Sequence, residues 1–131
     1  METRDREALS LIIARRGGSG HREHLELAWI YLRMHPYDEA AEAMVAAIRH
    51  LARTHGAEQK FHETMTRAWL RCVAVHARRW GAPDFDSFLE RNPQLLERDL
   101  LTHFYSRELI GSPGARAAWA EPDLRMLPAL A

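Results

Sequence analysis

The residues most able to do chemistry in this sequence are histidines, and three of the eight stand out: His21, His24 and His62. His21 and His24 lie three residues apart and begin an apolar stripe at helical spacing, made of Leu25, Ala28, Trp29 and Leu32. Residues at this spacing share one face of a helix, so both imidazoles are expected to face the core or its rim. His62 lies close to a second such stripe, which contains Trp69.

Three imidazoles at one place predict a site for a divalent transition metal such as zinc, iron, copper or nickel. Neutral imidazole is a common nitrogen ligand of these metals, and a catalytic zinc usually has three protein ligands and one open position. The open position would hold a water or a substrate, so the leading expectation is a metal-dependent enzyme acting on a small molecule. Glu63 is the nearest candidate base.

Two other interpretations of these histidines stay open. Imidazoles near helix N-termini are often neutral and satisfied by hydrogen bonds to backbone or carboxylate groups, with no ligand. They can also orient or protonate an organic ligand without a metal, as part of an acid–base enzyme or a binding module. A pair spaced HxxH is common, and it is not the HExxH pattern of zinc proteases.

Neighbouring residues could complete a ligand site. Thr64 and Thr66 could orient His62 or contact a ligand, although a threonine inside a helix usually bonds back to the carbonyl four residues earlier. Trp29 and Trp69 could stack on a ligand, although their helical spacing favours a place in the core.

A second polar cluster lies near the C-terminus. Tyr105 begins the segment Tyr-Ser-Arg-Glu, and Arg116 follows eleven positions later. Tyr105 or Arg116 could close over the pocket and bind an anionic group. The alternative, which the sequence favours, is a network of surface ion pairs around a short helix.

Composition excludes several classes of protein. The 18 basic and 18 acidic residues balance, whereas a nucleic-acid-binding domain usually has a basic excess. Cys72 is the only cysteine, so an internal disulfide and a cysteine-rich zinc site are excluded, and it reads as an inert buried thiol. No apolar run is long enough for a membrane helix or a signal peptide. We expect a cytoplasmic protein whose partner is a small-molecule ligand rather than nucleic acid or a membrane.

The elements that must position these residues are all helical. Apolar spacing and breakers predict helices over residues 3–15, 21–34, 39–54 and 58–80, then short helices capped by Asp84 and started by Pro93 and Pro113. The fold class is therefore all-α, a compact bundle of about five to seven helices. Residues 1–20 are predicted as a helix with a glycine-rich linker, and residues 21–131 as the core domain.

The short connections predict that the three long helices pack as antiparallel neighbours. The helices over 21–34 and 58–80 would then run in the same direction. Their N-terminal ends would meet at one end of the bundle, and this would bring the three histidines together.

The motifs resemble those of a small, uncharacterised bacterial family of all-helical proteins. The segments His21–Arg33 and Lys60–Trp69 match its HRxHLxxAWxxLR and KFHxTxTxAW motifs, and residues 105–123 resemble its closing motif. The likeness spans about residues 21 to 127. The resemblance implies no reaction, but it does imply that His21, His24, His62, Thr64 and Thr66 belong to one signature.

A third hypothesis is a protein-interaction role. The first helix carries a narrow apolar stripe of Leu9, Ile12 and Ile13, and glycines tether it to the rest of the chain. Such a stripe could dock on a partner or on a second copy, giving a homodimer.

Overall fold

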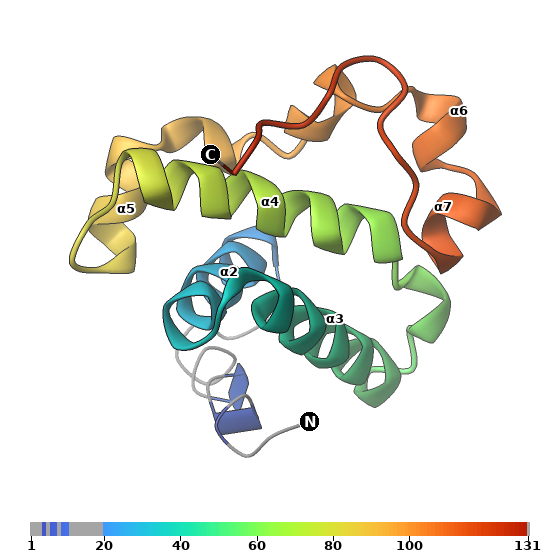
Figure 1. Ribbon diagram of the computed structural model, residues 1–131. Coiled ribbons are helices and arrows are strands. Elements are labelled where there is room, and N and C mark those ends of the chain that lie inside the picture. The colour runs from blue at the N-terminus through green and yellow to red at the C-terminus, as the bar shows by residue number, and fades with distance from the viewer. Residues whose placement is uncertain (1–3, 5, 8, 11–19, 131) are drawn as a thin grey trace. The chain divides into compact units, whose positions relative to one another are not determined.

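The computed structural model describes residues 4, 6, 7, 9, 10 and 20–130, and its regular elements are helices (Figure 1). No strand occurs in the described residues, which confirms the all-α prediction. The chain divides into two compact units, residues 1–61 and residues 62–131. None of the helices in the described part is both long and apolar enough to cross a bilayer.

The first unit is built on two helices, α2 (His21–Met34) and α3 (Tyr37–Thr54), followed by a 3₁₀ turn, η1 (Glu58–Lys60). α2 begins where the sequence predicts, and the Glu23 carboxylate accepts a hydrogen bond from the Gly20 N–H at its start (2.8 Å). Its end is set by Pro36, because the residue before a proline avoids helical backbone. α3 starts directly after that proline, two residues earlier than predicted.

The core of the first unit lies between α2 and α3, which pack against each other. Apolar residues recur along α3 at helical spacing. Ala40, Met44, Ala47 and Leu51 are buried, and Ile48 is partly exposed. On α2 the buried face is rotated from the predicted one, since Tyr31 is fully buried while Trp29 is not. The described residues of the first predicted helix are helical, and Leu9 is buried. Ile12, Ile13 and Gly17 to Ser19 lie outside the described residues.

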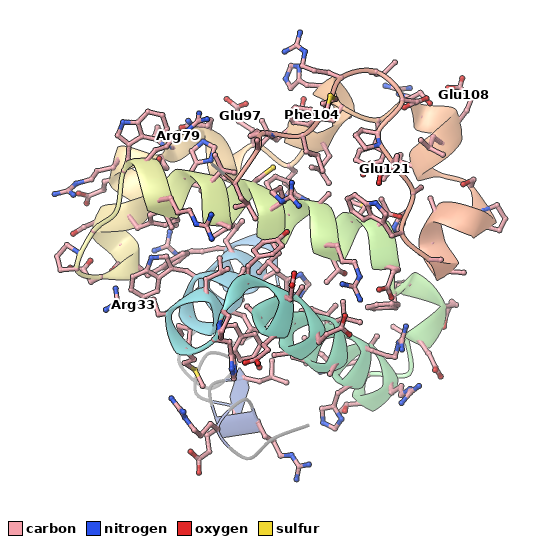
Figure 2. The ribbon with its side chains drawn as sticks, in the orientation of Figure 1. Arg33, Arg79, Glu97, Phe104, Glu108 and Glu121 are labelled. Atoms are coloured by element: carbon pink, nitrogen blue, oxygen red, sulfur yellow. The ribbon has the colours of Figure 1, made fainter. Side chains whose placement is uncertain are left out.

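The second unit contains one long helix and a series of short elements. They are α4 (Glu63–Arg79), α5 (Phe85–Arg91), η2 (Pro93–Leu96), η3 (Leu100–His103), α6 (Arg107–Ile110) and α7 (Pro113–Ala117). α4 packs against α7 and η3, α5 against η2, and α6 against α7. Exposed charged side chains such as Arg79, Glu97 and Glu108 point outward from this unit (Figure 2).

The start of α4 differs from the prediction. A single helix over residues 58–80 is wrong, because residues 58–60 form the separate turn η1 and His62 has extended backbone (φ −136°, ψ 108°). His62 is therefore the N-cap of α4 and not a residue on its face. The cap of α5 by Asp84 and the start of α7 at Pro113 are confirmed, whereas the segment after Asn92 forms 3₁₀ turns.

Candidate functional site

The two units divide the predicted site residues between them. His21, His24 and Trp29 belong to the first unit. The second unit contains the remaining seven, which are His62, Glu63, Thr64, Thr66, Trp69, Tyr105 and Arg116. Among the described residues, no group of three or more His, Cys, Asp or Glu side chains is arranged to hold a metal ion.

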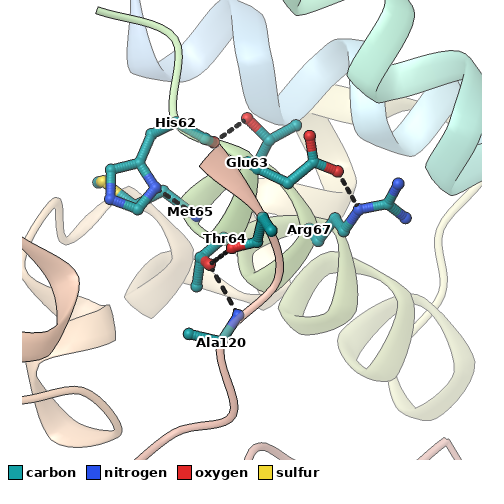
Figure 3. A network of polar contacts seen from close by, with 8 residues as sticks. His62, Glu63, Thr64, Met65, Arg67 and Ala120 are labelled. Carbon is teal, nitrogen blue, oxygen red and sulfur yellow. Dashed lines mark hydrogen bonds and ion pairs between the residues drawn. The ribbon is translucent and has the colours of Figure 1, made fainter. Parts of the chain in front are cut away.

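His62 has a hydrogen-bond partner at each ring nitrogen. Its Nδ1 accepts a hydrogen bond from the Met65 N–H (3.1 Å), which caps the first turn of α4 (Figure 3). Its Nε2 lies 2.6 Å from the carbonyl oxygen of Ile110, to which it donates. These two bonds fix one neutral tautomer, with the proton on Nε2. A metal at either nitrogen would have to displace one of these partners.

Electrostatics favour the same neutral state of His62. Burial lowers the pKa of this imidazole, the hydrogen bond to the Ile110 carbonyl raises it, and the nearby charge of Arg116 lowers it again. The net direction is downward. His62 is therefore suited to hold two backbone groups near neutral pH, and it is not poised to carry a positive charge.

Thr64 holds the tail that follows α7. Its fully buried hydroxyl donates to the Ala118 carbonyl (2.9 Å) and accepts from the Ala120 N–H (3.0 Å), as Figure 3 shows for the latter residue. Tyr105 holds the same stretch, because its hydroxyl donates to the Ala120 carbonyl (2.8 Å). Burial, and then the charge of Glu121, raises the pKa of Tyr105 to about 12, so the phenol stays a donor.

The next stretch of the tail is tied to the start of α6. Both Asp123 carboxylate oxygens accept hydrogen bonds from Ser106, one from its N–H (2.8 Å) and one from its hydroxyl (2.6 Å). These bonds lower the pKa of Asp123, because they stabilise the charged form. The Leu124 N–H donates to the Phe104 carbonyl (2.9 Å).

Glu63 and Thr66 have local partners on α4. Glu63 is buried, and its carboxylate accepts a hydrogen bond from Arg67 Nε (2.5 Å), the residue one turn later (Figure 3). Thr66 donates to the His62 carbonyl (2.8 Å), the bond expected of a threonine inside a helix.

We call His62, Thr64 and Tyr105, together with the backbone groups they hold, the tail anchor. Three hydrogen bonds of the anchor join the N-terminal end of α4 to backbone groups of residues 110, 118 and 120, and a fourth joins Tyr105 to residue 120. These bonds are part-buried, and a backbone group that is shielded from water and left unpaired costs about 1–3 kcal/mol. His62, Thr64 and Tyr105, which the sequence suggested for a ligand site, thus stabilise the backbone of this unit.

His21 and His24 form the other candidate group, on the first turns of α2. The pKa of His24 is lowered, first by burial and then by the proximity of His21, while Glu23 raises it. The His24 Nε2 atom is buried and has no hydrogen-bond partner in the described part of the chain. A buried ring nitrogen without a partner can accept or donate one further bond, to a ligand or to a metal.

Two tryptophans and the single cysteine complete the set of side chains considered in the sequence. The Arg33 guanidinium lies 4.6 Å from the centre of the Trp29 ring, and Trp69 is partly exposed on α4. Cys72 is buried, as expected, and burial raises the pKa of its thiol to about 12, far from the reactive range.

Asn92 was not singled out by the sequence pattern. It is fully buried, and its Nδ2 donates to the Trp80 carbonyl (3.1 Å) and the Phe88 carbonyl (2.9 Å), while its Oδ1 has no partner among the residues that the structure describes. Because the amide nitrogen serves two acceptors, a flipped side chain would lose both bonds. Asn92 therefore fastens the end of α4 to α5, and its place before Pro93 was the only local signal.

Comparison of the chain with protein-family models, curated proteins and solved structures gave no match. The resemblance to a bacterial helical family stays a prediction from the motifs.

Proposed function

We propose that the protein binds a small organic ligand without a metal, and that His24 in the first unit contacts this ligand. The observation that carries the proposal is the buried Nε2 atom of His24, which has no partner in the described part of the chain. A buried polar atom is unfavourable until it is paired, so a ligand that pairs with it gains affinity.

The protonation state of His24 defines what the ligand must offer. Burial and the neighbouring His21 both disfavour the imidazolium form, so His24 is neutral near neutral pH. A neutral imidazole binds a hydroxyl, an amide or a carboxylic acid through one hydrogen bond. If the ligand is a substrate, the same lowered pKa suits His24 to act as a general base.

The experiment follows the histidine ring signals of the intact protein by NMR while a library of small hydroxy acids, amides and amines is added. We expect a hit to shift the His24 ring signals, to raise the melting temperature and to be unaffected by a chelator. His24→Leu should abolish these effects, whereas His55→Gln, at an exposed position on the first unit, should retain them. Hits that bind the leucine variant equally well would contradict the proposal.

A second candidate is the metal-dependent enzyme predicted from the sequence. The observation in its favour is that two imidazoles lie three residues apart at the start of α2, and that one of them has a nitrogen with no partner among residues 20–130 or the other described positions. Zinc, iron, copper or nickel would suit such donors. His62 as a third ligand, with Glu63 as the base, stays a prediction, and in this role His62 would give up a hydrogen bond of the tail anchor.

Metal analysis of the purified protein separates the two candidates. Stoichiometric metal that falls in both His21→Ala and His24→Ala supports the enzyme, and metal at background level in the wild type contradicts it. Loss of metal in His62→Ala, with the fold retained, would add the third ligand. A cytoplasmic location, a bacterial origin and dimerisation through the first helix stay proposals beside these two.

A further inference from the structure

The first unit contains a pocket of about 330 Å³ whose lining is basic. Four of its residues come from α3, at positions separated by three, four and seven, so they share one face of that helix. The fifth comes from the helical residues near the N-terminus. The lining residues are Arg6, Ala46, Arg49, His50 and Arg53.

The chemistry of this lining points to one class of ligand. Three guanidinium groups and an imidazole line the pocket, and no carboxylate is among the lining residues. A guanidinium is planar, stays charged, and offers paired N–H donors that match two oxygens of a phosphate. The volume is at the lower end of the range for small-molecule sites. We propose that this pocket binds the phosphate groups of a small phosphorylated molecule.

Two of the arginines are held in place before a ligand arrives. The Arg49 guanidinium lies 4.6 Å from the centre of the Phe61 ring, a cation–π contact. Arg53 Nε donates to the Glu58 carboxylate (3.0 Å), which leaves the terminal nitrogens of its guanidinium out of that bond. Side chains that are already positioned lose less conformational entropy on binding. Ala46 has the smallest side chain of the lining and keeps that side of the pocket open.

A simpler reason for basic residues here is the C-terminal end of α3, whose carbonyl groups attract cations. That attraction is confined to about the last turn of a helix. It accounts for Arg53, which precedes the final residue Thr54. It does not account for Arg49, which lies further from the end, or for Arg6, which comes from a different segment.

Isothermal titration calorimetry of the full chain with inorganic pyrophosphate tests the proposal. Ionic strength is kept near about 10 mM, where screening is weak. We expect saturable binding that Arg49→Gln and Arg53→Gln each weaken by about tenfold, the loss expected for one charge-assisted hydrogen-bonding pair. Arg49→Lys should give an intermediate affinity, since it keeps the charge and loses the planar donors.

Arg33→Gln is the matched control. Arg33 belongs to the same unit and lies over an aromatic ring at the same 4.6 Å, but it does not line the pocket. Its removal should leave the affinity unchanged. An equal loss in this variant would show attraction to surface charge in general and would overturn the proposal, as would the absence of any pyrophosphate binding by the wild type.

Two further measurements complete the test. Poly-glutamate is titrated under the same conditions, and tighter binding of this polymer than of pyrophosphate would favour an acidic polypeptide and overturn the small-molecule ligand. Circular dichroism checks that each variant folds. If Arg53→Gln unfolds, His50→Gln on the same exposed face replaces it, and an unchanged affinity in both that variant and Arg49→Gln would contradict the proposal.

Discussion

The two candidate groups of this protein use the same side chain in opposite ways. In the second unit, His62 has both ring nitrogens occupied by backbone groups. In the first unit, His24 has a buried Nε2 with no partner in the described residues. Burial lowers the pKa of both. A lowered pKa and a buried position therefore do not mark a binding site by themselves, and the decisive observation is whether the ring nitrogens have partners.

The largest expected effect belongs to the tail anchor, at Thr64. Replacing it with valine keeps the shape of the side chain and removes a donor to Ala118 and an acceptor for Ala120. Both backbone groups then lose a part-buried hydrogen bond to the buried Thr64 side chain, so we expect the free energy of unfolding to fall by about 3 kcal/mol. Urea denaturation measures this change. Thr66→Val is the control, since its hydroxyl bonds only within α4, and it should cost well under half as much.

His62 should show the next largest effect, and two variants separate its two bonds. His62→Leu loses the cap of α4 and the bond to Ile110, so we expect a loss of about 2 kcal/mol. Asparagine is a good N-cap residue, and it is too short to replace the bond to Ile110. His62→Asn should therefore recover about half of the loss. Equal stability of both variants would show that the cap contributes nothing.

Unlike His62→Leu, the substitution His24→Leu should not lower the free energy of unfolding appreciably. The substitution removes a buried nitrogen that has no partner within the described ranges of the chain, and it puts a strong helix former into α2. The stability should therefore stay within about 1 kcal/mol of the wild type or rise. The same denaturation experiment measures it. A loss as large as that of His62→Leu would mean that His24 is held as firmly as His62, and the contrast between the two histidines would disappear.

The pH dependence of stability gives the smallest and most specific test. Both histidines have a folded-state pKa below the ordinary value of 6.5, so the unfolded chain takes up protons first as the pH falls. Their contribution to stability is complete above pH 6.5 and is lost as the pH falls toward the folded-state values. Denaturation between about pH 8 and pH 5 should show this decline. His24→Leu and His62→Asn should each flatten it, and a steeper decline in either variant would reverse the sign that burial predicts.

Local signals explain why much of the fold could be predicted from the sequence. Gly20 and Pro36 bound α2, and Asp84 and Pro113 mark the starts of α5 and α7. These residues act through backbone geometry and caps within a few positions, which a sequence displays directly. The start of α4 was missed because histidine is not among the common N-cap residues, so the apolar spacing carried the predicted helix through position 62.

The site was harder to predict because its partners are distant in the sequence. The Thr64 hydroxyl bonds backbone groups 54 and 56 positions away, and His62 reaches a carbonyl 48 positions away. Helical periodicity reports which face a residue occupies, and it carries no information about such partners. The sequence therefore indicates that His62 and Thr64 are unusual polar residues, but only the folded chain shows that they bond to the backbone of residues 110–120.

The side chains of the tail anchor form hydrogen bonds with backbone atoms, so substitutions at the bonded positions need not break these bonds. Residues 110, 118 and 120 are held through their carbonyl and N–H groups. The four hydrogen bonds therefore do not depend on the side chains at these positions. A saturation library over these three positions should accept most amino acids of moderate size. Proline is the exception at all three positions. At position 120 it lacks the N–H that donates to Thr64, and at positions 110 and 118 it lacks the N–H that donates to the Ser106 and Gly114 carbonyls. The side chains at these three positions can therefore vary as long as His62, Thr64 and Tyr105 are kept, whereas Asp123 further along the tail bonds through its own side chain.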